Sequence, residues 1–462
     1  MPDRRAALVL IDGEHYPNVV TAALEELSDR YEFCGALFLG GTEKIEAEDL
    51  RSRAQELYGL PTEIAGGDYA EGLDRALKRF QPEVVVDASD EPVIGYVERF
   101  RLVSHALAQG VTYEGSDFRF TPPRLERVAT HPSLSIIGTA KRVGKTAVSG
   151  FVTRSLRDMF AESSAGEVVI VPMGRGGPPE PEVIEGISRE LRAKDLLAWS
   201  REGRHGASDH FEDAVISRVT TVGCRRCGGG LAGEPLSSNV REGALVANAL
   251  APELIVFEGS GAAIPPVETD ARLLVAGAHQ PIDYVTGYLG TYRVLISDLV
   301  VLAMAEEPLA SKEKTAAMIA AIRAVKPGLT VIPVVFRPQP ATSVAGRKVA
   351  VFSTAPEALR PRLSAFLEQE HGAEVVAYSR NLSDRSRLRE DLDQPGVKRA
   401  EVFLTEIKAA AVDVVAEAAE DRGREVVFMD NLPVEVEPAR AGELAKHSRA
   451  LGRLAAQRFK AR

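Results

Sequence analysis

A short glycine-containing turn constrains the fold of this chain more than any other segment. Residues 138–146 read Gly-Thr-Ala-Lys-Arg-Val-Gly-Lys-Thr, after a strand-like apolar run at Leu134–Ile137 and before a helix-like stretch at Lys145–Met159. A strand, a turn of this kind and a helix in succession are the context of a phosphate-binding loop. The turn is a variant, because Thr139 stands where the usual pattern has its first glycine and Gly138 lies one position earlier.

The turn carries the groups that hold the terminal phosphates of a nucleotide. Successive backbone N–H groups curl around an oxyanion at the positive end of the following helix. Lys145 would reach the β- and γ-phosphates, the Thr146 hydroxyl would bind Mg²⁺, and Gly144 would permit close backbone approach. The alternative is a chance Gly-Lys-Thr in a glycine-rich turn, which the flanking strand and helix disfavour. We expect ATP and Mg²⁺ as cofactors, with the nucleotide at Gly138, Thr139, Ala140, Val143, Gly144, Lys145, Thr146 and Ala147.

Strand-like and helix-like stretches alternate along nearly the whole chain, which predicts an α/β protein with mainly parallel sheets. The chain has 462 residues, too many for one ordinary core. Thr121-Pro122-Pro123-Arg124 breaks the alternation and indicates a boundary. We predict three domains: a Rossmann-like parallel-sheet domain at 1–128, a P-loop ATP-binding domain at 129–345, and a C-terminal α/β extension at 346–462 packed with the P-loop domain.

Composition excludes several classes of protein. The net charge is −10, so general binding of nucleic acid is not expected, because the phosphates would repel the chain. No run approaches the roughly 20 apolar residues that cross a bilayer, and no signal-peptide pattern follows the N-terminus. Three cysteines in a chain of this length argue against a disulfide-stapled secreted fold. We therefore expect a cytoplasmic protein without a membrane partner.

A carboxylate at the end of a buried strand is the candidate metal ligand. The apolar run Leu254–Phe257 ends in Glu258-Gly-Ser-Gly. P-loop enzymes place an acidic group at the end of a neighbouring strand to hold Mg²⁺, and an unpaired buried charge would be costly. A helix N-cap partner is the alternative for Glu258. Asp209 is a further candidate metal ligand, although a charge that complements a helix dipole is the favoured interpretation there.

Basic residues in three loops are candidate anion donors. Arg175 lies in the glycine-rich loop Met173–Pro181, where a substrate clamp and a plain turn with a solvated arginine remain open alternatives. Lys141 and Arg142 lie inside the phosphate loop and could face the transferred phosphoryl group, with a surface charge an equal alternative for Arg142.

The third loop contains a Cys-x-x-Cys pair, with Arg225 and Arg226 between the two cysteines. Cys224 and Cys227 lack the further ligands of a structural zinc site, so two ordinary cysteines are favoured over a metal or redox pair. Arg225 and Arg226, next to a glycine run, are the more interesting candidates as anion donors.

The first region has polar clusters at two predicted strand ends, Asp12–Pro17 and Asp87–Pro92. Acids, a histidine and prolines at such loops suggest a functional edge, but strand-end loops are rich in turn residues in any case. We assign no chemistry to single residues there, and His15 is favoured as structural.

These motifs carry a family resemblance. The loop at 138–146 together with Glu258–Gly261 resembles the dethiobiotin synthetase branch of P-loop enzymes over about residues 130–340. The longer chain is similar to the cyclic 2,3-diphosphoglycerate synthetase family. This similarity rests on the motifs at 11–17, 174–178, 223–230, 292–298 and 405–413, which span nearly the whole chain.

The resemblance implies that ATP and 2,3-diphosphoglycerate give the cyclic phosphoanhydride, ADP and phosphate, in a homodimer. Charge control is then the main task of the site, and no side-chain nucleophile is required. Lys145, Lys141 and Arg175 are the implied catalytic residues. The implied substrate-binding residues are Arg142, Arg175, Arg225, Arg226 and Arg293. Dethiobiotin synthetase loops have acidic or hydroxyl residues where this loop has Lys141 and Arg142, a departure that favours a more anionic substrate.

Two alternatives remain open at this level. One is another P-loop kinase or ligase acting on a small anionic metabolite. The other is an ATPase switch or metallochaperone, which the Cys-x-x-Cys pair slightly favours. Switch members carry an additional lysine in the loop, and Lys141 lies one position away from that register, which weakens the switch hypothesis.

Overall fold

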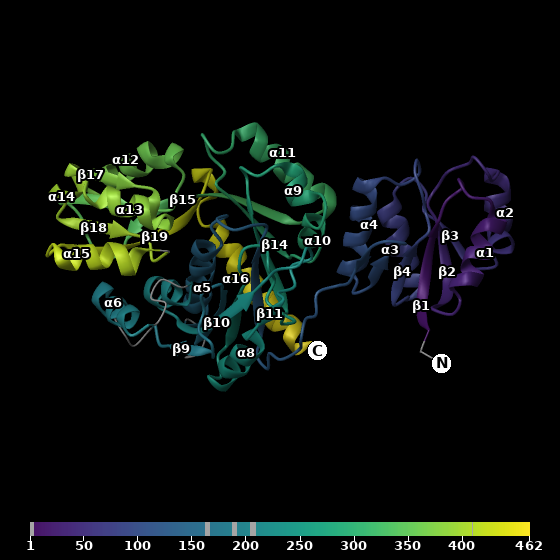
Figure 1. Cartoon of the computed structure of the whole chain (residues 1–462), viewed down its shortest axis with the longest axis horizontal. Coiled ribbons are helices and arrows are strands. Elements are labelled where there is room, and N and C mark those ends of the chain that lie inside the picture. Colours follow the sequence, from purple (N-terminus) through teal and green to yellow (C-terminus); the bar gives the residue numbers. More distant parts are fainter. Residues whose placement is uncertain (1–3, 162–166, 187–191, 204–208, 409) are drawn as a thin grey trace. The chain divides into compact units, whose positions relative to one another are not determined.

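The computed structural model describes residues 4–161, 167–186, 192–203, 209–408 and 410–462. Contacts within the chain define two compact units. The first comprises Met1–Pro123 together with Pro281–Ile296, and the second comprises Arg124–Gln280 together with Ser297–Arg462. Each unit is built on one sheet with helices beside it (Figure 1). The predicted α/β class is therefore confirmed.

The sheet of the first unit has the strand order β3-β2-β1-β4-β5-β6. All neighbouring pairs are parallel except β5 and β6. The chain moves outward from β1 and then crosses to β4, as in a Rossmann-like fold. Its elements are β1 (Arg5–Ile11), α1 (Pro17–Leu27), β2 (Tyr31–Phe38), α2 (Ala47–Tyr58), β3 (Thr62–Ile64), α3 (Tyr69–Phe80), β4 (Val84–Asp87), α4 (Tyr96–Ala108), β5 (Thr112–Glu114), β6 (Arg119–Phe120), α9 (Ile282–Thr286) and α10 (Gly290–Leu295).

The second unit contains the predicted phosphate loop. Its strands are β7 (Ser133–Gly138), β8 (Val168–Gly174), β9 (Glu182–Ile184), β10 (Thr220–Cys227), β11 (Ser237–Ser238), β12 (Leu254–Glu258), β13 (Ala271–Gly277), β14 (Leu299–Ala303), β15 (Thr330–Pro340), β16 (Lys348–Phe352), β17 (Glu374–Ser379), β18 (Val402–Thr405) and β19 (Glu425–Glu435). Its α-helices are α5 (Lys145–Ala161), α6 (Ala193–Arg201), α7 (Asp209–Glu212), α8 (Val240–Ala249), α11 (Lys312–Val325), α12 (Arg360–His371), α13 (Arg385–Leu392), α14 (Pro395–Arg399), α15 (Glu417–Asp421) and α16 (Glu443–Lys460).

The strand before the phosphate loop lies in the middle of a parallel sheet. The order is β10-β8-β12-β7-β13-β14-β15, so β7 has β12 and β13 as neighbours. Every residue of β7 is buried, which explains the continuous apolar run seen in its sequence. The carboxyl ends of these strands meet at one edge, where ligands bind in parallel sheets.

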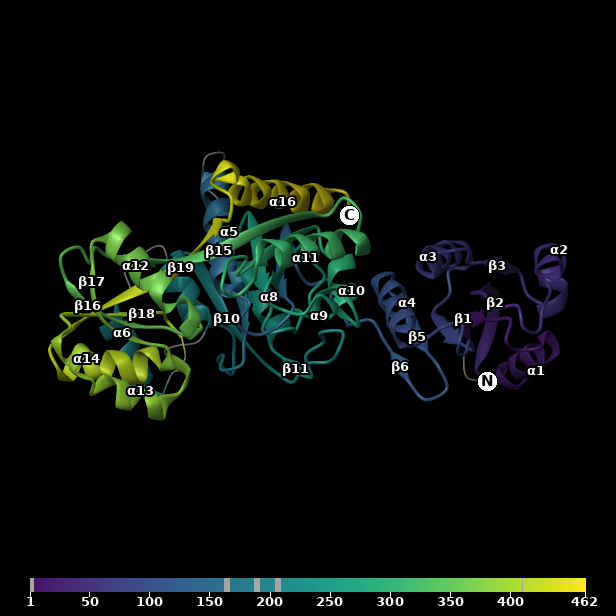
Figure 2. The same cartoon turned by 90° about the horizontal axis from the view of Figure 1, so that it is seen from above.

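Helices cover both faces of this sheet. On one face, Val148 and Val152 of α5 pack with Leu451 and Ala455 of α16 over β7 and its neighbours. Figure 2 shows α16 beside α5. On the other face, Ala244 and Ala247 of α8 pack against β8 and β12. The core therefore fixes the start of α5, and with it the phosphate loop.

The C-terminal part continues the same sheet. Strand β15 pairs with β19 in antiparallel fashion, and β19, β18, β16 and β17 follow as parallel neighbours. The predicted division at about residues 128 and 345 stays a prediction. The grouping of Pro281–Ile296 with the first unit was not anticipated from the sequence.

Helix α4 begins at Tyr96, after a turn in which the amides of Val93 and Ile94 donate to the carbonyl oxygen of Asp90. Strand β13 was not predicted, although it is a direct neighbour of β7. None of the helices in the described part of the chain is long and apolar enough to span a membrane.

Candidate active site

Close packing surrounds both glycines of the phosphate loop. A Cβ atom at Gly144 would lie 2.1 Å from the ring of Phe336, and the φ of this residue is +84°. A Cβ atom at Gly138 would lie 3.2 Å from the carbonyl oxygen of Gly261 and 3.4 Å from Cδ of Lys145. The loop therefore lies between Phe336 and the turn after β12. The positive φ favours glycine at position 144, and the tight contact with a main-chain oxygen favours it at position 138.

Lys145 and Thr146 are the first two residues of α5. Lys145 is only 8% exposed, which keeps its side chain within the fold, and Thr146 is half-buried. The N-terminus of a helix of 17 residues directs backbone N–H groups towards this loop. The local structure is that of a triphosphate-binding turn.

Glu258 lies next to the loop, as the sequence pattern predicted. It ends β12, pairs with Ile136 of β7 on one side and with Pro172 of β8 on the other, and is 2% exposed. The amide of Gly259 donates to the carbonyl of Ile136 at 2.9 Å. A buried carboxylate thus ends the strand beside the one that enters the phosphate loop.

Two arginines and a loop amide converge at Gly261. A Cβ atom built on this residue would lie 3.1 Å from Nη2 of Arg175, 3.4 Å from Nη2 of Arg226 and 4.0 Å from the backbone nitrogen of Lys141. The two guanidinium groups therefore lie close to one another and beside the phosphate loop. Paired guanidinium groups of this kind suit a phosphate or carboxylate ligand.

Main-chain oxygens orient Arg226. Its Nη2 donates to the carbonyl oxygen of Ser260 at 2.7 Å, and its Nη1 donates to the carbonyl of Gly228. Arg175 is exposed and makes no ion pair within the described residues. The two guanidinium groups reach Gly261 from the ends of neighbouring strands, because β8 and β10 pair in parallel with Gly174 opposite Arg225.

Asn239 holds the two arginine-bearing loops together. Its Oδ1 accepts from the amide of Arg225 at 2.7 Å, and its Nδ2 donates to the carbonyls of Pro178 and Pro179, each at 3.2 Å. Gly177 packs so closely on this junction that a Cβ there would lie 2.0 Å from the carbonyl oxygen of Cys224. The spacing of the loops is thus set by contacts that involve no ligand.

Comparison with known proteins places the chain in a family. Family models match residues 6–121 (cyclic 2,3-diphosphoglycerate synthetase, N-terminal domain), 133–335 (the P-loop domain of the same synthetase) and 340–432 (its C-terminal domain). The chain belongs to the cyclic 2,3-diphosphoglycerate synthetase family. Three proteins with this name are similar over nearly the whole chain.

The relative from Rubrobacter xylanophilus is 53% identical, over 96% of this chain and 98% of that protein. The relative from Thermococcus kodakarensis is 45% identical, over 97% of this chain and 100% of that protein. The relative from Methanothermus fervidus is 41% identical, over 95% of each chain.

The cyclic 2,3-diphosphoglycerate synthetase P-loop domain contains most of the predicted site residues, and the structure brings several of them together. Lys141 lies in the phosphate loop, Lys145 begins α5, and Glu258 ends the strand next to β7. The guanidinium groups of Arg175 and Arg226 lie beside Gly261. Gly138, Ala140, Val143, Gly144, Thr146 and Ala147 lie in the turn or at the start of α5. Arg225 is exposed at the end of β10, beside Arg226.

Three predicted residues lie elsewhere or outside the description. The Nη2 of Arg142 donates to Ser383 Oγ at 3.1 Å, so this side chain contacts the family's C-terminal domain. Arg293 belongs to the other compact unit, is 5% exposed and donates to the carbonyl of Leu289; burial lowers its pKa. Asp209 is the first residue of α7, and its side chain is outside the described part of the structure.

The two cysteines of the Cys-x-x-Cys pair differ in exposure. Cys224 is buried, which raises the pKa of its thiol to about 12, and Cys227 is exposed. Within the described residues, no group of three or more histidine, cysteine or acidic side chains could hold a metal ion.

Acidic residues of the polar clusters in the family's N-terminal domain form hydrogen bonds and an ion pair within that domain. The Asp12 carboxylate accepts from His15 Nδ1 at 2.9 Å and from the backbone amides of Glu14 and Asp90. Asp87 is paired with Arg99. Hydrogen bonds between strand-end loops account for these residues, in line with a structural role for His15.

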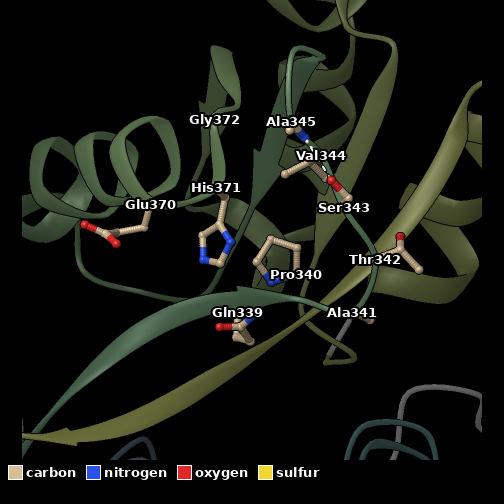
Figure 3. Close-up of a pocket in the computed structure, with 10 residues that line it drawn as sticks. All are labelled: Gln339, Pro340, Ala341, Thr342, Ser343, Val344, Ala345, Glu370, His371 and Gly372. Atoms are coloured by element: carbon tan, nitrogen blue, oxygen red, sulfur yellow. Dashed lines mark hydrogen bonds between the residues drawn. The ribbon is translucent and has the colours of Figure 1, made fainter.

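A separate cavity of about 490 Å³ lies in the C-terminal part of the chain. Figure 3 shows the His371 ring beside Pro340, between the end of β15 and the end of α12. It is lined by Gln339, Pro340, Ala341, Thr342, Ser343, Val344, Ala345, Glu370, His371 and Gly372. No lysine or arginine is among these residues, so the lining does not suit a phosphorylated ligand.

Sequence reasoning missed Gly261 and Asn239. Gly261 lies three residues after Glu258, which was selected for its charge, but glycine itself carries no side chain that suggests a role. Asn239 carries no charge and lies 14 residues beyond Arg225, so nothing local marks it. A glycine shortly after an acidic strand end was the one signal that the sequence offered for Gly261, and the structure shows a positive φ there.

Proposed function

We propose that the protein uses ATP and Mg²⁺ to convert 2,3-diphosphoglycerate into cyclic 2,3-diphosphoglycerate, with release of ADP and phosphate. The observation that carries the proposal is the anion position over Gly261, where two arginines and a phosphate-loop amide converge. Membership of the cyclic 2,3-diphosphoglycerate synthetase family supports this choice of substrate. A substrate with two phosphates and a carboxylate needs such a concentration of donors.

The proposed reaction has two steps. One phosphate oxygen of the substrate attacks the γ-phosphorus of ATP, and the bond to ADP breaks. The second substrate phosphate then attacks the phosphorus of the substrate phosphate that received the γ-phosphoryl group. This attack closes the ring and expels the former γ-phosphate of ATP as inorganic phosphate. Both attacking oxygens are already ionised at neutral pH, so the protein needs to position and neutralise charge but need not remove a proton.

Each basic residue has a proposed role. Lys145 and the loop amides hold the β- and γ-phosphates of ATP, and Lys141 with Arg175 stabilises the charge on the transferred group. Arg175 and Arg226 hold the substrate phosphate over Gly261, with Arg225 as a further donor. Arg142 and Arg293 stay predicted substrate contacts, with less support, since Arg142 contacts Ser383 and Arg293 lies in the other unit.

The residues beside the loop fit a magnesium ion. Hydroxyl and carboxylate oxygens are the donors that Mg²⁺ prefers, usually one or two per site with phosphate oxygens completing the shell. Thr146 and Glu258 would hold it, and the burial of Glu258 beside the phosphate loop supports that role. Bound Mg²⁺ would neutralise phosphate charge during transfer. Asp209 stays a predicted further ligand.

Phosphorus NMR tests the reaction directly. Purified protein with ATP, Mg²⁺ and 2,3-diphosphoglycerate should give new phosphoanhydride resonances with matching ADP. Lys145→Ala should abolish turnover, and Arg175→Ala should raise the KM for 2,3-diphosphoglycerate more than the KM for ATP. ATP hydrolysis at a rate indifferent to 2,3-diphosphoglycerate would reject the synthetase and favour an ATPase switch. Product formation only with a different anionic metabolite would favour another P-loop kinase or ligase.

Two further properties are proposed. The resemblance implies a homodimer, which size-exclusion chromatography with light scattering measures. The sequence composition suggests a cytoplasmic location, which fractionation of cells measures.

A further inference from the structure

Thr139 is the residue that makes the phosphate loop a variant, and its backbone explains why glycine is dispensable there. Thr139 is not among the residues with positive φ, and it is 4% exposed. The close approach in this part of the loop occurs at Gly138, where a Cβ atom would lie 3.2 Å from the carbonyl oxygen of Gly261. The loop glycine is therefore displaced to the position where the backbones meet, and a side chain can occupy residue 139.

Both hydrogen-bond donors of Thr139 are used inside the protein. Its amide donates to the carbonyl of Val275 at 3.0 Å, and its hydroxyl donates to Gln280 Oε1 at 2.6 Å. Neither proton remains for a phosphate oxygen in this arrangement. Thr139 lies in the nucleotide loop, but its contacts hold the loop to the neighbouring strand β13.

Gln280 is the other half of this connection. Its Oε1 also accepts from the amide of Gly277 at 2.9 Å, its own amide donates to the carbonyl of Gly277 at 3.0 Å, and the residue is 7% exposed. A side chain with few exposed atoms and two donors on one oxygen has little freedom to move. The end of β13 is thus clamped to the phosphate loop through one amide oxygen.

Gln280 is the last residue of the second unit before Pro281–Ile296, the segment that belongs to the first unit. The chain therefore leaves the P-loop core directly from the residue that is bonded to the loop. A shift of the loop on nucleotide binding would act on the start of this connecting segment.

We propose that Thr139 and Gln280 are positioning residues that set the geometry of the phosphate loop and tie it to the connecting segment 281–296. The proposal rests on the proposed function only in that a nucleotide occupies the loop. It predicts that removal of the hydroxyl alone impairs phosphate transfer, and that restoring the usual glycine at position 139 makes the enzyme worse.

Three variants of one residue test the positioning role. Thr139→Val removes the hydroxyl at constant shape, Thr139→Ser keeps it, and Thr139→Gly restores the usual motif. We expect kcat/KM for ATP to fall about tenfold in Thr139→Val and at least as far in Thr139→Gly, the order expected for one buried hydrogen bond. Thr139→Ser, which keeps the hydroxyl, should be clearly more active than Thr139→Val. Equal activity of the valine and serine variants would overturn the proposal.

Hydrogen exchange gives a measurement that a purely structural role of Thr139 would not change. In the wild type, Mg²⁺ with a non-hydrolysable ATP analogue should slow exchange of the amides of Gly277 and Gln280. In Thr139→Val the same addition should leave them unchanged, even with the analogue at saturation. No response in the wild type would overturn the coupling whatever the variants do, including the case in which a variant fails to fold.

The same design separates this inference from the proposed function. The exchange experiment needs only the nucleotide, so it can succeed with a protein that makes no cyclic product. A wild type that is inactive on 2,3-diphosphoglycerate but shows the hydroxyl-dependent response would reject the proposed function alone. Lys145→Ala is the control, since loss of nucleotide binding should remove the response while Thr139 and Gln280 stay in place.

Discussion

Replacement of Gly261 by alanine should separate the anion position from the nucleotide site. At a φ of +60°, alanine adopts a left-handed conformation that costs about 1–2 kcal/mol. Its Cβ would lie 3.1 Å and 3.4 Å from the guanidinium nitrogens of Arg175 and Arg226, so both groups must shift by a few tenths of an ångström. A hydrogen bond to a charged group contributes about 1.5–3 kcal/mol, so loss of one such bond to the substrate lowers kcat/KM for 2,3-diphosphoglycerate by about 10- to 150-fold.

A matched control isolates the effect of backbone strain. Gly423 has the same φ of +60° and no atoms within 4 Å of a built Cβ. Gly423→Ala should lose similar stability in thermal unfolding but keep its activity. The assay is steady-state ADP release with each substrate varied in turn, and the KM for ATP should change by less than threefold in Gly261→Ala. If Gly261→Ala retains its kcat/KM for 2,3-diphosphoglycerate, or loses affinity for both substrates equally, the anion position is misplaced.

Two further predictions concern parts that support the site. Asn239→Ala should raise the KM for 2,3-diphosphoglycerate about tenfold with little change in the KM for ATP. The control is Asn248→Ala, which removes similar hydrogen bonds to main-chain groups elsewhere and should leave both KM values unchanged. Equal effects of the two variants would refute the role of Asn239 in positioning the loops. The second prediction concerns Glu306, which contributes to the stability of the fold. Burial raises its pKa, but the guanidinium groups of Arg337 and Arg362 outweigh burial and hold the pKa below the ordinary 4.5. A carboxylate whose pKa is lowered on folding stabilises the fold above its ordinary pKa of 4.5, and this stabilisation is lost as the pH falls. Glu306→Gln should thus lose about 1–2 kcal/mol in urea unfolding at pH 7 and less at pH 4, and a pH-independent difference would contradict this.

The sequence was sufficient for the phosphate loop because its determinants are local. Gly144, Lys145 and Thr146 are adjacent, and the strand before them and the helix after them are visible as patterns. Glu258 could be selected as well, since a carboxylate at the end of an apolar run has few structural explanations. Its place beside β7 follows from the strand order, which the sequence does not specify.

Contacts between distant segments were beyond the sequence. The convergence of Arg175 and Arg226 on Gly261 depends on the order β10-β8-β12-β7, in which strands far apart in the chain become neighbours. For the same reason, nothing local shows that Thr139 bonds to Gln280 or that Arg142 contacts Ser383. The grouping of Arg293 with the first unit also depends on long-range packing, so the role that the resemblance implies for it gave no information about its location.

Main-chain acceptors hold part of the Arg226 side chain. The carbonyl oxygens of Gly228 and Ser260 accept from its guanidinium group. A carbonyl fixes the direction of a guanidinium without adding a full negative charge. The carboxylate of Glu306, at 2.6 Å and 2.8 Å from Arg337, instead orients and neutralises its partner. A main-chain acceptor therefore orients an arginine without competing with an anionic ligand, which suits the phosphate site that we propose beside the phosphate loop.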